Sequence, residues 1–154
     1  MRCFVLSIAG ILLFGRAVVI ADEGKPNLSG TWKIDQARTE LRQTEKNLVL
    51  LIEETDENIH IEETRGPNPR SDVSHFTCST VGKECPMEDG GDKARVSVYY
   101  NGKVLVVLKT RGRKGETVEK RRFSLSPPGD SLTMEIMHIE PAGQTEKLVF
   151  SKAR

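Results

Sequence analysis

The chain is poor in aromatic residues, and it lacks the long apolar periodicity of helices. Aromatic residues make up 5% of its 154 positions, with a single Trp. This composition suits a small domain with one thin core better than a large α/β enzyme. No strand-like run is followed by a long stretch of apolar residues at helical spacing, so a parallel sheet built from βαβ units is not expected.

The usual signatures of catalysis and of cofactor binding are also missing. No Ser lies in a G-x-S-x-G elbow, and no Gly-rich phosphate loop precedes a helix. The three histidines, His60, His75 and His138, lie on three different predicted strands, without the close spacing of zinc ligands. We therefore predict a protein that is not an enzyme, with no cofactor and no metal site.

Neither sign of charge dominates. The chain has 23 basic and 22 acidic residues, and two of the basic ones, Arg2 and Arg16, lie in the leader described below. The remaining 21 basic and 22 acidic residues give a formal charge of −1, which provides no long-range attraction to nucleic acid. Seven basic residues gather between positions 109 and 122, without aromatic residues for base stacking. Cross-strand pairing with nearby Glu residues is the simpler explanation of this basic segment; binding of a phosphate or an acidic glycan is the alternative.

Residues 1–21 have the three parts of a signal peptide. Arg2 gives a positive start, Cys3–Phe14 form an apolar or small run, and Ala21 precedes a cleavage point before Asp22. An uncleaved anchor is the rival interpretation, but Arg16 interrupts the apolar residues and the first run is too short to cross a bilayer. We predict a mature domain of residues 22–154, exported to the periplasm or the extracellular space, with no integral membrane span.

Two cysteines remain in the mature chain. Cys78 and Cys85 flank Gly82, which lies where a hairpin would turn. Folding the chain at Gly82 places the two Cβ atoms opposite each other, at the roughly 4 Å that a disulfide requires. Exported proteins retain such bonds. The spacing is not C-x-x-C, so a structural disulfide is favoured over a redox-active pair.

The mature sequence alternates between β-rich runs and turn residues at short, regular intervals. Asn101-Gly102 is the strongest hairpin signal, because this dipeptide adopts the turn that matches strand twist. The expected strands are 29–34, 47–55, 58–65, 72–80, 83–87, 94–100, 103–110, 116–125, 131–139 and 145–152.

Several of these runs alternate as half-buried strands do. An uninterrupted antiparallel meander of one-sided strands leaves open edges, and closure into a barrel removes them. We therefore predict an all-β protein of about 8–10 strands closed into a small barrel. Residues 35–46 are the polar exception, predicted as one short helix or an irregular strap. The expected inward residues are Leu50, Ile59, Ile61, Val106, Leu125, Met134 and Ile136.

The segment Leu28-Ser29-Gly30-Thr31-Trp32-Lys33-Ile34-Asp35 carries a family resemblance. It resembles the opening of small exported bacterial proteins described as lipocalin-like, which begin L-S-G-T-W and end on an apolar strand. More broadly, the chain is similar to lipocalins and fatty-acid-binding proteins, whose first strand carries Gly-x-Trp. The residues between Asp35 and Asn47 are too few for the helical lid of the latter family.

The resemblance implies a lipocalin-like or calycin-like barrel with specific structural residues. Gly30 and Trp32 match the Gly-x-Trp positions, where the Trp closes one end of the barrel. Arg154 or Lys152 would be the basic side chain that packs over the Trp.

The resulting functional hypothesis is an exported module that binds an apolar or amphipathic small molecule. His138, Met134 and Ile136 share one strand face and are candidate ligand contacts; Arg122 is a candidate partner for a carboxylate head group if it points inward. The alternative is an envelope or extracellular barrel with a packed interior, which binds a protein or polymer through its surface. The ligand and the oligomeric state are left open.

Overall fold

The computed structural model describes residues 24–39, 47–66, 72–112 and 114–154. The signal peptide expected at 1–21 lies outside the described residues, as does most of the strap expected after Asp35. The described part of that strap, residues 36–39, consists of turns and a bend, so the short helix expected there is absent from this part.

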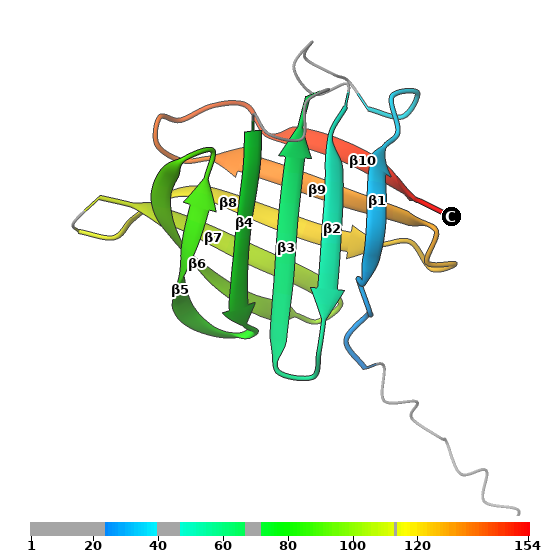
Figure 1. Ribbon diagram of the computed structural model, residues 1–154, viewed down its shortest axis with the longest axis horizontal. Helices are drawn as coiled ribbons and strands as arrows, with labels where there is room; N and C mark the ends of the chain where they lie inside the picture. The colour runs from blue at the N-terminus through cyan, green and yellow to red at the C-terminus, as the bar shows by residue number, and fades with distance from the viewer. Residues whose placement is uncertain (1–23, 40–46, 67–71, 113) are drawn as a thin grey trace, which may run out of the picture.

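The described residues form ten antiparallel strands that close into one barrel (Figure 1). Each strand pairs with the next in the chain, and β1 pairs with β10 to complete the ring. The fold is therefore an up-and-down, calycin-like barrel, as predicted. The strands are β1 (Gly30–Ile34), β2 (Val49–Glu54), β3 (Asn58–Arg65), β4 (Asp72–Ser79), β5 (Val81–Asp89), β6 (Asp92–Asn101), β7 (Val104–Arg111), β8 (Glu116–Leu125), β9 (Ser131–His138) and β10 (Glu146–Lys152).

Alternating side chains and short turns explain these strands. In β9, Leu132, Met134 and Ile136 are buried while the residues between them are more exposed. At the β6–β7 turn, Gly102 adopts φ 59°, a left-handed conformation that residues with a Cβ rarely accept. The observed bounds differ from the predicted ones by a few residues, chiefly in β5, which also includes residues predicted as a polar loop.

The prediction that Val106 points into the barrel core is wrong. Val106 is buried, but it does not belong to the core cluster; its neighbours Leu105 and Val107 do. Apolar residues on both sides of β7 hide the alternation in the sequence, because a run of Val and Leu fits either register. The other expected inward residues pack in or against the core.

Trp32 closes the core near one end of the barrel. Its side chain is fully buried, and its Nε1 donates a hydrogen bond to the carbonyl oxygen of Leu28 at 2.9 Å. The Lys152 ammonium lies 5.2 Å from the ring centroid. Gly30 allows this approach, because a Cβ at that position would lie 2.7 Å from Lys152 Cε. Of the two basic candidates, Lys152 is therefore the one that packs over the Trp.

The segment before β1 is held over this same end by a buried carboxylate. Glu54 accepts hydrogen bonds from Tyr100 Oη at 2.6 Å and from Leu28 N at 3.1 Å, and Lys25 Nζ lies 3.3 Å away. Burial raises the pKa of Tyr100, and the hydrogen bond to Glu54 raises it further. We call this the closed end of the barrel.

The expected disulfide is present. Cys78 on β4 and Cys85 on β5 are bonded, with their Cα atoms 5.5 Å apart. The chain turns between them at Gly82, which has φ 82°. The bond links two adjacent strands at the hairpin end.

A polar cup as candidate functional site

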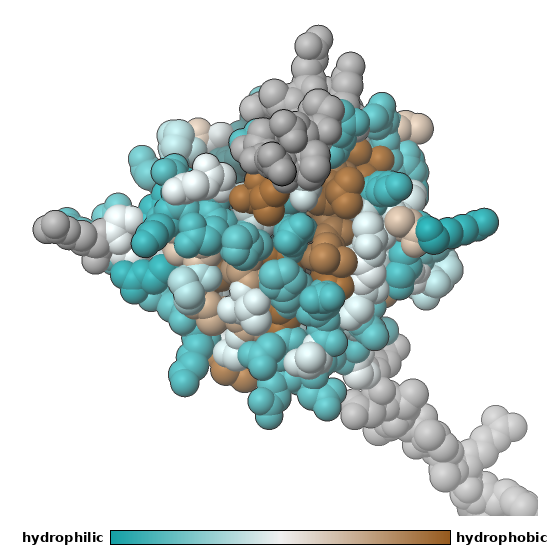
Figure 2. Space-filling model, in the orientation of Figure 1, coloured by the Kyte–Doolittle hydropathy of each residue, from teal (hydrophilic) through white to brown (hydrophobic). Residues whose placement is uncertain are grey.

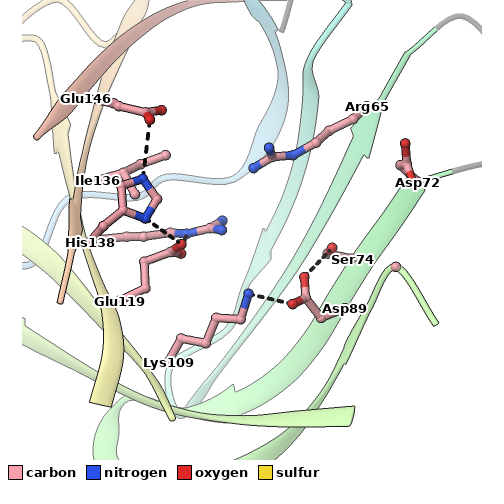
Figure 3. A pocket seen from close by; sticks show the side chains of 11 residues that line it. Arg65, Asp72, Ser74, Asp89, Lys109, Glu119, Ile136, His138 and Glu146 are labelled. Carbon is pink, nitrogen blue, oxygen red and sulfur yellow. Dashed lines mark hydrogen bonds and ion pairs between the residues drawn. The ribbon is translucent and has the colours of Figure 1, made fainter. Parts of the chain in front are cut away.

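The end of the barrel opposite the closed end contains a hollow of about 410 Å³ lined mainly by charged residues. β3 ends there at Arg65, β4 begins at Asp72, β5 ends at Asp89 and β9 ends at His138. Figure 3 shows side chains from these strands converging on the space. We call this hollow the polar cup; its lining is Arg65, Asp72, Ser74, Asp89, Gly90, Lys109, Glu119, Arg121, Ile136, His138 and Glu146.

A network of buried ion pairs forms the floor of the cup. Arg121 on β8 contacts Glu63 on β3 at 2.5 Å across the interior, and Glu119 on its own strand at 2.5 Å. Arg65 pairs with the same Glu63. Burial alone would raise the pKa of Glu63, but the charges of Arg121 and Arg65 outweigh it and hold that pKa below its ordinary value. Glu63 therefore stays ionised in the barrel interior.

A second set of ion pairs completes this floor. Lys109 on β7 contacts Asp89 on β5 at 2.5 Å, and Arg111 contacts the same carboxylate at 2.6 Å. The Ser74 hydroxyl donates a further hydrogen bond to Asp89 at 3.0 Å. Burial opposes ionisation, but the hydrogen bonds and charge of Lys109 and Arg111 lower the pKa of Asp89 to about 2. Asp89 is thus a fixed anion that orients two cations.

His138 lies on the opposite wall between two carboxylates (Figure 3). Its Nε2 is 3.3 Å from Glu146 Oε1, and its Nδ1 is 3.7 Å from Glu119 Oε2. The imidazole can thus donate to one carboxylate or, when charged, contact both. A ring nitrogen and several carboxylate oxygens therefore face the cup, alongside the cations of its floor.

Beneath the charged floor, the barrel interior is filled. The void in this region measures about 10 Å³, no more than the smallest volume that can hold one water molecule. Lys109 and Arg121 border it from above, and the other residues around it are apolar: Ile61, Phe76, Met87, Val96, Val107 and Phe123. Of these two spaces, the polar cup, and not the apolar void beneath it, is large enough for a ligand.

The candidate ligand residues predicted from the sequence fall in three places. His138 and Ile136 line the cup, whereas Met134 lies fully buried below it. Arg122 lies on the outer face, where its guanidinium contacts Glu135 at 3.1 Å. The inward arginine is the adjacent Arg121, so the head-group role considered for Arg122 has no support from its position.

The sequence prediction missed the residues that form the floor, namely Glu63, Asp89, Lys109 and Arg121. One signal was present: Arg121 is two residues from the apolar Phe123, and alternation places both on the same face of β8. The basic segment 109–122 is therefore divided, with Lys109 and Arg121 directed into the cup and paired with carboxylates.

Within the described ranges, no group of three or more His, Cys, Asp or Glu side chains is arranged to hold a metal ion. In that same part of the chain, no helix is long and apolar enough to cross a membrane.

Comparison with known proteins identifies the fold. No family model and no curated protein sequence matches the chain. Among solved structures, the REP1-NXSQ fatty acid transporter superimposes with a TM-score of 0.61 at 9% identity, over 82% of this chain and 96% of the transporter. Human cRBP IV superimposes with a TM-score of 0.58 at 18% identity, over 83% of this chain and 99% of its own. These similarities establish a shared barrel fold.

Proposed function

We propose that this protein is a binding module that holds a small amphipathic molecule, with the polar group of the ligand seated in the cup. The observation that carries the proposal is the hollow of about 410 Å³ at one end of the barrel, which is lined mainly by charged side chains and lies above an apolar void of only about 10 Å³. Small-molecule sites typically measure about 300–1,000 Å³. A polar group that both donates and accepts hydrogen bonds fits this lining.

The charged floor supports a functional role because stability alone does not favour it. Replacing a buried ion pair by apolar residues of similar size is often neutral or stabilising. Glu63 and Arg121 have side chains only 3% and 10% exposed, yet they remain charged between apolar strands. Their retention is explained if the floor presents an ordered polar surface to a ligand.

The fold neighbours support the same class of function. One of them is a fatty acid transporter, whose cargo combines an apolar chain with a polar group. The present barrel differs in its local chemistry, because an ion-paired layer separates the cup from the apolar residues beneath it. We therefore assign the polar group to the cup, with His138 and Ile136 as contacts, and leave the chain length of the ligand to experiment.

The deciding experiment is native mass spectrometry of the exported protein, followed by thermal shift against fatty acids, isoprenoids and haem. We expect a co-purifying small molecule or a dose-dependent rise in melting temperature. His138→Ala should weaken binding about tenfold, the value of one hydrogen bond to a charged group. Arg122→Ala is the matched control, because Arg122 lies outside the barrel. Equal affinity in the wild type and His138→Ala, or a loss confined to Arg122→Ala, would place the ligand elsewhere.

A second candidate is a surface-binding barrel without a small ligand, and the filled apolar interior favours it. The same ligand panel separates the two functions. If no member of the panel shifts the melting temperature and nothing co-purifies, the surface-binding function is the better account.

We also propose that the protein is exported and that residues 1–21 are removed. The Cys78–Cys85 disulfide supports an oxidising compartment, because such bonds do not persist in most cytosols. The intact mass of the exported protein should begin at Asp22. A product that retains Met1 and sediments with membranes would instead indicate an anchor.

A further inference from the structure

The structure brings together two of the three histidines on the outer wall of the barrel. His60 on β3 lies opposite Thr77 on β4, and His75 on β4 lies opposite Glu62 on β3. The histidines are therefore diagonal neighbours on one sheet face. Their ring centroids are 6.5 Å apart with a 45° tilt. Figure 2 shows the face over β3 and β4, where hydrophilic side chains lie among apolar ones. His75 is exposed and His60 is half-buried, so both rings can be reached from solvent.

The hydrogen bond of His60 leaves one ring nitrogen for a ligand. Its Nδ1 lies 2.9 Å from the Thr77 hydroxyl oxygen. Metal-ligating histidines are usually oriented by such a bond at the ring nitrogen that does not bind the metal. The Nε2 atom of His60 is then the coordinating atom, and the Thr77 hydroxyl holds the ring.

Carboxylates surround the pair. The strand register places Glu53 beside His60, and it places Glu62 and Glu88 on either side of His75. Their negative charge favours a divalent cation over an anion at this wall. Among the described residues, no third His, Cys, Asp or Glu side chain joins the two histidines in a group that could hold a metal ion. The two imidazoles are therefore the protein ligands, and water completes the coordination shell.

We propose that His60 and His75 form a surface site for a divalent transition metal, Cu²⁺, Ni²⁺ or Zn²⁺, bound through two imidazole nitrogens. Imidazole suits these three ions, and the affinity order for a nitrogen site places Cu²⁺ first. Two imidazoles bound at metal–nitrogen distances of about 2.0–2.1 Å in a cis-planar or tetrahedral shell have ring centroids about 4.5–5 Å apart. The observed separation of 6.5 Å must therefore shorten by about 1.5–2 Å, which side-chain rotation on the surface supplies. This site is independent of the cup and of any ligand that the cup holds.

The test is titration of the untagged mature protein with each metal ion by calorimetry, with electron paramagnetic resonance of the Cu²⁺ form. We expect coordination by two imidazole nitrogens. His60→Ala and His75→Ala should each lower the affinity about tenfold or more, and Thr77→Val should lower it to a smaller extent. Both histidines lie on the surface, so the variants should keep the circular dichroism of the wild type.

His138→Ala is the informative comparison, because His138 lies between two carboxylates in the cup and is the rival metal site. Its affinity should equal that of the wild type. An affinity unchanged in His60→Ala and His75→Ala, or lost only in His138→Ala, would overturn the proposal, and so would a Cu²⁺ spectrum without two imidazole nitrogens.

Discussion

Replacing Arg121 by Met should destabilise the barrel by about 3 kcal/mol at neutral pH. The change removes the charge that faces Glu63 at 2.5 Å but keeps an unbranched, apolar side chain of similar reach. Removal of one partner from a buried pair costs about 3–5 kcal/mol. The lower end applies here because Arg65 still pairs with Glu63 after the substitution.

Urea unfolding followed by the fluorescence of Trp32 measures this loss, because Trp32 is the single Trp and is fully buried. A pH series gives the mechanism. In the wild type the pKa of Glu63 is lowered on folding, so its contribution is present above its unfolded pKa and is lost as the pH falls. Without Arg121, one of the two charges that oppose the effect of burial is lost, so the pKa of Glu63 rises and Glu63 accepts a proton at a higher pH than in the wild type. The difference in stability between Arg121→Met and wild type should therefore shrink on acidification.

The double variant Glu63→Met/Arg121→Met closes the cycle. It should recover part of the lost stability, because Glu63 no longer leaves a buried charge without its partner, whereas Glu119 still lacks the ion pair with Arg121. A loss below about 1 kcal/mol in the single variant, the size expected of an exposed pair, would contradict the reasoning. A loss that does not depend on pH would also contradict it.

Three further predictions concern the rest of the barrel. Trp32→Ala should cost about 3–5 kcal/mol, and native Trp32 emission should be blue-shifted and move red on unfolding; a red native maximum would refute burial. Replacing Cys78 and Cys85 together by Ser should lower the free energy of unfolding by about 2.5 kcal/mol, the value for so short a loop, and should leave the circular dichroism spectrum unchanged. Loss of the β-sheet spectrum would mean that the disulfide is needed to specify the fold. The pKa of Asp89 is about 2 in the folded protein against 3.8 unfolded, so ionised Asp89 should stabilise the fold by at most about 2 kcal/mol above pH 4. Unfolding free energies measured at a series of acidic pH values should show this contribution disappear between about pH 4 and 2 in the wild type. Asp89→Asn should show no such loss.

The strand layout and the disulfide were predictable because their causes are local. Turn dipeptides such as Asn101-Gly102 and the two-residue alternation of Ile59 and Ile61 specify hairpins without knowledge of distant residues. The hairpin about Gly82 places Cys78 and Cys85 opposite each other by counting along the chain. Closure into a barrel then follows from a series of one-sided strands without a covering layer.

The cup was not predictable to the same degree because it depends on pairing across the barrel. No pattern in the sequence identifies Arg121, which lies 58 residues after Glu63, as the partner of Glu63. The register between β7 and β8 also shifts between Lys109 and Thr110, so the faces of the two strands cannot be matched by counting from their turn. For the same reason His60 and His75 appear unrelated in the sequence, although the β3–β4 register makes them neighbours.

The inward face of β8 shows how one strand encodes both parts of the interior. From Phe123 toward the start of β8, the inward residues are first this aromatic ring, then Arg121 and then Glu119. On β9 the same change runs in the opposite chain direction, from Met134 through Ile136 to His138. Antiparallel strands bring these two changes to one level, so the polar layer extends across the barrel near a single end. A ligand entering from that end meets ion pairs before apolar side chains, and any reach beyond the cup requires separation of Arg121 from Glu63. On the proposed function, we therefore expect the chemistry of the polar group, rather than the length of an apolar chain, to determine which molecules bind.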